Sequence, residues 1–147
     1  MNLIENAKSI LLSSMAAKPG ENVLVVTDDS KLEIGNAIYL AAKELGCEAM
    51  LMVMGERSVS GEEPPAAVAA AMAAADIVLC PTAKSLTHTN ARINAVKQGA
   101  RIATMPNITK EMFEKGAMTA DYTRVEALTA AVTELLTKAS TARIVKE

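Results

Sequence analysis

The stretch from Thr82 to Thr109, TAKSLTHTNARINAVKQGARIATMPNIT, contains the chain's one histidine among several hydroxyl side chains. Imidazole and hydroxyl groups are those that acid–base and nucleophilic catalysis use. Ser85 and His88 are three residues apart, a spacing at which two side chains can meet. A buried strand, IVLCPT, is expected before them, and a helix, HTNARINAVKQG, is expected to begin at His88. Because parallel α/β sheets bind ligands where strands lead into helices, this stretch is the first candidate site.

Further polar residues are expected at the same edge of the sheet. Asp28 and Asp29 close the first expected strand, and Asn107 follows the last one. With Arg92, one helical turn after the histidine, the ligand-edge candidates are Asp28, Asp29, Thr82, Ser85, His88, Arg92 and Asn107. A capped helix with a histidine at its start is also consistent with a purely structural role. We expect His88 to be structural. Its expected partners are backbone groups or, if the first and third strands are neighbours, Asp28 or Asp29.

The sequence lacks the common catalytic and phosphate-binding motifs. After the first strand comes TDDSKLEIG, which does not match the GxGxxG of a dinucleotide site, and no GxxxxGK[ST] loop occurs. A receiver domain would place its acceptor aspartate at the end of the third strand, where this chain has Cys80-Pro81-Thr82. No GxSxG elbow surrounds Ser85. We therefore predict no catalytic residue in this chain.

Composition argues against several kinds of partner. Cys47, Cys80 and His88 are too few for a zinc site with the usual four nitrogen or sulfur ligands, so no metal site is predicted in this chain. A net charge of −2, with one Phe, two Tyr and no Trp, argues against nucleic acid. The sequence shows neither a long apolar run nor the apolar core of a signal peptide. We therefore expect no membrane partner and a cytoplasmic location.

Helical and extended patterns alternate along the chain. Apolar spacing predicts helices over about residues 3–14, 31–45, 64–75, 88–99, 110–116 and 121–139. Continuous apolar runs predict strands over 22–29, 47–54, 77–82 and 100–106, as in a sheet covered on both faces. The alternation predicts an α/β fold with a doubly wound, mainly parallel four-stranded sheet and helices on both faces. The expected strand order is the flavodoxin-like 2-1-3-4.

Two helices have distinctive apolar patterns. The helix from Asp121 to Ala139 carries an apolar set on one face: Val125, Leu128, Ala131, Val132, Leu135 and Leu136. The face from Ala67 to Ala75 is expected to be an interface, because that helix is apolar nearly all round. The final ARIVKE is expected to begin another strand. We expect residues 1–147 to be a single α/β domain, the N-terminal part of a longer two-domain protein.

Three strings together resemble a known family. GENVLVVTDD, SLTHTNAR, and GARIATMPNITKEMF with ADY at 120–122 are similar to the N-terminal domain of M29-type aminopeptidases, also called aminopeptidase T or thermophilic metallopeptidases. The wider group includes ring-cleaving dihydroxypyridine dioxygenases. The resemblance covers nearly the whole chain. It implies a two-metal site of Glu, His, Tyr and Asp ligands in a separate C-terminal domain, holding Zn, Co or Mn, and it transfers no catalytic or metal-binding residue to this chain.

The resemblance implies a scaffold and interface domain of a metal-dependent aminopeptidase-family protein that is not catalytic alone. Its partners would be the C-terminal metal-binding domain of the same protein and, in a homo-oligomer, a second copy. Two alternatives stay open. One is the same domain of a ring-cleaving dihydroxypyridine dioxygenase. The other is a stand-alone flavodoxin-like module that binds a small ligand at Asp28, Thr82, Ser85, His88 and Asn107.

Overall fold

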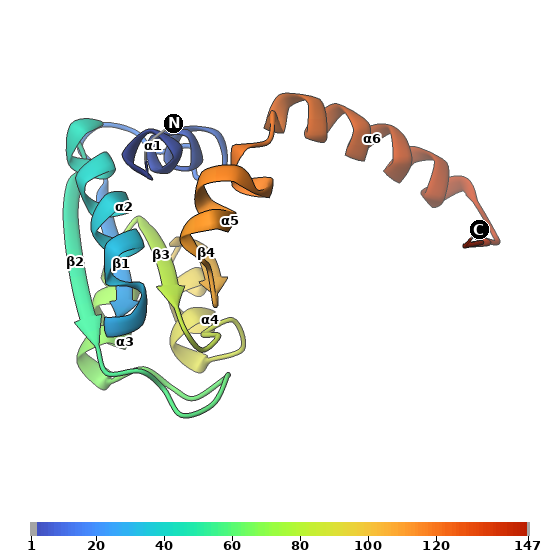
Figure 1. Ribbon diagram of the computed structural model, residues 1–147. Helices are drawn as coiled ribbons and strands as arrows, with labels where there is room; N and C mark the ends of the chain where they lie inside the picture. Colours follow the sequence, from blue (N-terminus) through green and yellow to red (C-terminus); the bar gives the residue numbers. More distant parts are fainter. Residues whose placement is uncertain (1–2, 147) are drawn as a thin grey trace.

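A computed structural model describes residues 3–146 (Figure 1). Its four strands form one parallel sheet in the order β2-β1-β3-β4, so the predicted α/β fold and strand order are confirmed. The elements, with η for a 3₁₀ turn, are α1 (Leu3–Ser13), β1 (Asn22–Asp28), η1 (Asp29–Lys31), α2 (Leu32–Glu44), β2 (Glu48–Met54), α3 (Ala66–Ala74), β3 (Ile77–Thr82), α4 (Asn90–Lys97), β4 (Arg101–Pro106), α5 (Lys110–Lys115), η2 (Ala117–Thr119) and α6 (Tyr122–Lys138).

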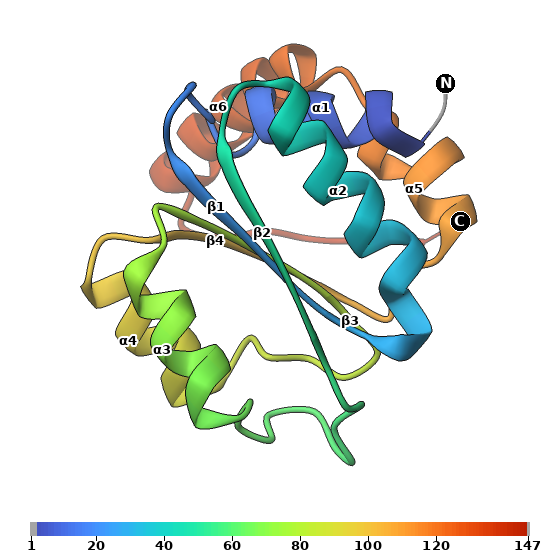
Figure 2. The ribbon, with the colours of Figure 1, turned by 90° about the vertical axis from the view of Figure 1, so that its left-hand side faces the viewer.

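Helices cover both faces of the sheet. Figure 2 shows α1, α2 and α5 on one side and α3 and α4 on the other. The first side has a core that includes Leu11, Ile38 and Phe113, and the second has a core that includes Leu24 and Met72. All five of these side chains are fully buried. The central strands β1 and β3 are buried along nearly their whole length because both of their faces lie against a core.

Strand register brings three chain segments to one edge of the sheet. Thr82 at the end of β3 pairs with Pro106 of β4, and β1 ends beside them at Asp28. Helix α2 starts close above this edge because Gly35 lies directly on β1. A Cβ atom at Gly35 would stand only 2.9 Å from the Cβ of Thr27. The fold therefore places the ends of β1, β3 and β4 and the start of α2 around the predicted ligand edge.

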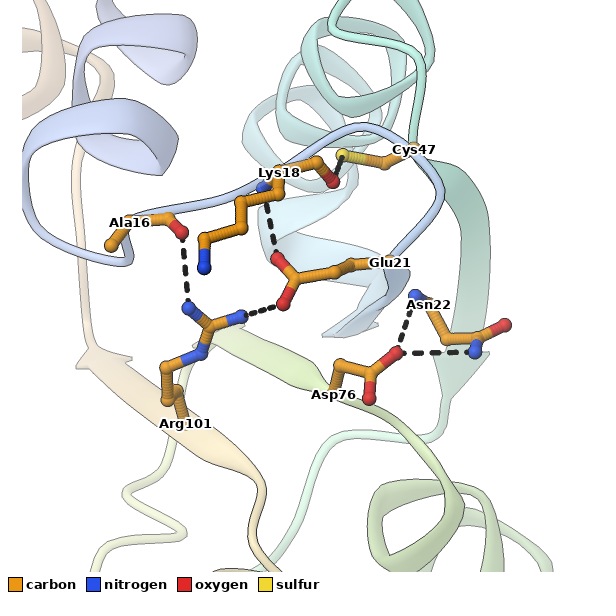
Figure 3. A network of polar contacts seen from close by, with 7 residues as sticks. All are labelled: Ala16, Lys18, Glu21, Asn22, Cys47, Asp76 and Arg101. Atoms are coloured by element: carbon orange, nitrogen blue, oxygen red, sulfur yellow. Dashed lines mark hydrogen bonds and ion pairs between the residues drawn. The ribbon is translucent and has the colours of Figure 1, made fainter.

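A polar network ties the opposite, amino-terminal edge together (Figure 3). The Nη2 of Arg101, at the start of β4, lies 2.6 Å from Oε1 of Glu21, and its Nη1 donates to the Ala16 carbonyl at 3.0 Å. Asp76 Oδ2 accepts hydrogen bonds from the backbone and side chain of Asn22. These bonds join the turn before β1 to the starts of β3 and β4, which is a structural role.

The Glu21 carboxylate in this network predicts a pH-dependent contribution to stability. The hydrogen bonds from the Arg101 guanidinium and the Lys18 amide lower the pKa of Glu21 below its ordinary value. Because the pKa of Glu21 is lower in the folded state, its ionised carboxylate stabilises the fold at pH values above the unfolded-state pKa. This stabilisation is lost as the pH falls through the folded-state pKa. The Glu21→Gln variant should therefore have a lower melting temperature than the wild type at neutral pH. This difference in melting temperature should disappear below about pH 4. A gap in calorimetric melting temperature that stays constant down to about pH 3 would contradict this assignment.

Helix α6 differs from the other helices because it leaves the body of the domain. None of its 17 residues is buried, and Figure 1 shows it running away from the two layers of helices. Residues 139–146 after it form no regular element, so the strand expected at ARIVKE is not formed over its described part, 142–146. Within residues 3–146 no helix, α6 included, is both long enough and apolar enough to cross a membrane.

Candidate functional site

Asp28, at the end of β1, is a buried carboxylate that binds the loop after β3. Its Oδ2 accepts a hydrogen bond from the Ala83 amide at 2.6 Å, and its Oδ1 accepts one from the Ser30 hydroxyl at 2.7 Å. The residue is only 1% exposed. A carboxylate is buried at low free-energy cost only when such donors replace its water. Asp28 therefore holds the edge together, and both of its oxygens are occupied.

Thr82 and Asn107 lie at the same edge and are also bonded. The Thr82 hydroxyl donates to the Lys84 carbonyl at 2.7 Å, and the Thr82 carbonyl accepts from the Asn107 amide at 2.8 Å. Asn107 has φ 53°, in the left-handed region that asparagine tolerates better than most residues. Its Oδ1 accepts a long hydrogen bond, 3.4 Å, from Lys31 Nζ. The structure thus brings Asp28, Thr82 and Asn107 together at one edge.

The hydroxyl-rich segment after β3 forms a chain of hydrogen bonds. Ser85 Oγ donates to Thr87 Oγ1 at 2.9 Å, and Thr87 Oγ1 lies 2.8 Å from the Thr104 hydroxyl on β4. Thr89 caps α4, since its Oγ1 accepts from the Arg92 amide. The Nε of Arg92 donates to the Thr87 carbonyl at 2.8 Å. These groups bind one another, and within residues 3–146 no hydrogen bond joins Ser85 to His88.

His88 lies outside this arrangement. Helix α4 begins at Asn90, so His88 occupies the turn before the helix rather than its first turn. Its side chain is exposed, and no hydrogen bond links its ring to any residue from 3 to 146. The expected partnership with Asp28 or Asp29 is wrong. Asp28 is engaged by the loop after β3, and Asp29 is exposed in η1.

The loop between β2 and α3 covers part of the edge. The Gly61 amide donates to the Ser85 carbonyl at 2.8 Å, and the Ser85 amide donates to Ser60 Oγ at 3.2 Å. The Glu63 carboxylate accepts hydrogen bonds from the first two backbone amides of α4. Sequence reasoning missed Glu63, because this cap lies 27 residues before the amide of Asn90, and no local pattern reveals so distant a cap.

Few groups at this edge remain available for chemistry. In the described part of the chain, no group of three or more His, Cys, Asp or Glu residues could hold a metal ion. A hollow of about 250 Å³ lies between the starts of α2 and α5, lined in part by Lys31, Ile108 and Lys110. It is smaller than the roughly 300–1,000 Å³ of typical ligand pockets. Lys110 at its wall is already paired with Glu33.

The clearest uncovered surface is an apolar stripe on α6. The α6 stripe consists of five large side chains that are 43–72% exposed: Val125, Leu128, Val132, Leu135 and Leu136. A continuous apolar surface of this kind usually marks an interaction site. By contrast, α3 buries its large residues, Val68 and Met72, and the side chains it exposes are alanines. The large exposed apolar side chains therefore lie on α6, and an interface at the Ala67–Ala75 face stays a prediction.

Comparison with known proteins gives a likeness of fold. No protein-family model matches the sequence, and no curated protein matches it. Among solved structures, the fold is similar to 2,5-dihydroxypyridine dioxygenase from Pseudomonas putida KT2440, with a TM-score of 0.61 and 18% sequence identity. The alignment covers 71% of this chain and 33% of that one. The chain thus spans about a third of the length of that structure.

These findings correct the identification as the N-terminal domain of an M29-type aminopeptidase. Neither family models nor curated proteins support it, and the solved structure described above is a dioxygenase. The strings that suggested the family serve the fold itself. In SLTHTNAR, Thr89 caps α4, and in GARIATMPNIT, Met105 is buried in the core and Thr109 caps α5.

Proposed function

We propose that this chain is a scaffold and interface domain, not catalytic by itself, whose working surface is the α6 stripe. The observation that carries the proposal is a 17-residue helix with no buried residue and a row of exposed Val and Leu side chains. In proteins, most of the stability of a helix comes from packing its amphipathic face against other elements rather than from helix propensity. A partner that covers α6 would supply that packing.

The hydrogen bonding of the carboxyl edge supports the same proposal. A ligand site needs polar groups that point into an open space and await a partner. Here the buried Asp28, Thr82 and Thr89 each bond to backbone or side chains of neighbouring loops. The edge works as the scaffold that holds the loops, and α6 presents the surface for binding.

The proposal extends to the larger protein in which such a domain would act. A likeness to one third of a longer enzyme supports a domain that works beside others, with any metal-dependent chemistry located in another domain. A cytoplasmic location is supported by the two thiols. Cys47 and Cys80 are both free and lie in the cores on opposite faces of the sheet.

A second candidate is a small-ligand module. It rests on the hollow beside Lys31 and Lys110, whose ammonium groups would favour an anionic ligand. It has less support, because the Lys110–Glu33 ion pair occupies part of the wall.

A hydrophobic dye tests whether the α6 stripe is an open binding surface. We expect anilinonaphthalene sulfonate to fluoresce with the dilute wild-type chain. Fluorescence should fall several-fold for the double variant Leu128→Ser, Leu135→Ser, because those side chains form the stripe. The matched control is Ala127→Ser with Ala130→Ser, which adds the same two hydroxyls to exposed positions of α6 outside the stripe. Equal dye binding by both double variants would contradict the proposal.

A further inference from the structure

The spacing of the α6 stripe is that of a helix-pairing seam. Val125, Leu128, Val132 and Leu135 follow one another at steps of three, four and three residues, and Ala139 continues the series after four more. This average of 3.5 residues keeps apolar side chains on one line that faces a second helix. All four large side chains are at least 43% exposed. The stripe therefore has the geometry to pair with a helix of matching spacing.

We propose that the occupant of this seam is α6 of a second copy of the chain, in a parallel two-helix pair. The inference rests on the proposed interface function and names its partner. Val stands at the first position of each repeat, 125 and 132, and Leu at the second, 128 and 135. In parallel coiled coils, β-branched residues at the first position with Leu at the second favour assemblies of two helices. The sequence thus favours a pair of helices over a larger bundle.

Charges beside the seam favour the parallel direction. The residues that flank it are Arg124, Ala131 and Lys138 on one side and Thr129 and Leu136 on the other. In a parallel pair each flank meets the opposite flank of the other helix, so Arg124 faces a threonine and Ala131 faces Leu136. In an antiparallel pair with the seam residues in register, Arg124 would lie near Lys138 of the second copy. The parallel pair avoids this like-charge contact and also covers Leu136, which is 57% exposed.

The position of α6 leaves the seam accessible to a second copy. A groove of about 780 Å³ separates α6 from the end of α1, and the α6 residues that line it include Tyr122, Glu126 and Thr133. Of the seam residues only Val125 reaches this groove. Leu128, Val132 and Leu135 therefore lie on a face turned away from the domain's own body. A second helix can reach them without displacing α1.

Sedimentation of the whole chain tests the inference. From about 5 to about 500 µM we expect a monomer–dimer equilibrium, and Leu128→Glu should weaken it at least about tenfold. Ala127→Glu, which adds the same charge to an exposed position off the seam, should leave it unchanged. Circular dichroism and melting temperature establish that each variant keeps the folded body. A wild-type chain that stays monomeric throughout, or a dimer that Leu128→Glu does not weaken, would overturn the inference.

Cross-linking tests the parallel direction. When the Val125→Cys variant is oxidised, it should form a disulfide-linked dimer, because a parallel pair places residue 125 of one copy against residue 125 of the other. The Ala127→Cys variant should form no such dimer. Neither should the wild type, because its cysteines are buried. Failure of Val125→Cys to cross-link in a chain that dimerises through α6 would overturn the parallel arrangement. If the chain is strictly monomeric but still binds the dye through the stripe, self-pairing is refuted and the proposed interface function is not. The stripe would then bind a different partner.

Discussion

Phe113→Ala should destabilise the fold by about 3–5 kcal/mol, the usual range for truncating a buried phenylalanine. Phe113 is the chain's single phenylalanine and is fully buried in the core between the sheet, α1 and α5. Its carbonyl also accepts a hydrogen bond from the buried Asn6 side chain at 2.9 Å. The alanine would leave a cavity at the point that anchors α5, from which the chain continues into α6. Urea denaturation followed by circular dichroism measures the loss.

The neighbouring Met112 supplies the control. It lies on the same short helix but is 53% exposed, so Met112→Ala should change the free energy of unfolding by no more than about 0.5 kcal/mol. If the two variants lose similar stability, α5 is not anchored through the Phe113 side chain.

Asp28→Ala should destabilise the fold by about 2–4 kcal/mol. It removes a hydrogen-bonded buried carboxylate, and hydrogen bonds to charged groups contribute about 1.5–3 kcal/mol each. The Ala83 amide and the Ser30 hydroxyl would lose their acceptor, so the loop after β3 should loosen from the start of α2. Asp28→Asn keeps an oxygen for the Ala83 amide and should lose only about 1 kcal/mol.

Two variants at nearby positions complete the comparison. His88→Gln should stay within about 0.5 kcal/mol of the wild type, because the ring is exposed and makes no hydrogen bond with residues 3–146. Asp29→Ala should cost no more than about 1 kcal/mol, the usual size of a charge effect at a helix start. Unfolding curves in which Asp28→Ala matches these two variants would show that the buried carboxylate does not hold the edge.

The fold could be predicted from the sequence because its signals are local and repeated. The run from Val23 to Val26 and the run from Ile77 to Cys80 are apolar without alternation, which indicates strands covered on both faces. Each is followed by a helix of the usual spacing, and right-handed crossovers then leave few strand orders. The position of Asp28, Thr82 and Asn107 at one edge follows from the same reasoning.

The bonding of the edge could not be predicted in the same way, because its partners are distant along the chain. Asp28 accepts a hydrogen bond from an amide 55 residues away, and Glu63 accepts one from an amide 27 residues away. Such bonds depend on the path of each loop, which no periodic pattern encodes. The same limit applies to α6. Its amphipathic pattern predicts a covered face, but a pattern does not say whether the cover comes from the same chain or from another.

Hydrogen exchange of the α6 amides in dilute protein is the most direct test of the claim that α6 is an interface helix. At low concentration, with no partner, we predict that the amides of residues 122–138 exchange much faster than those of β1 and β3, which stay protected to the level of global unfolding. Raising the protein concentration or adding a partner should then protect α6 alone. If α6 is as well protected as β1 in dilute monomer, the helix is stable without a partner, and its assignment as an interface helix is contradicted.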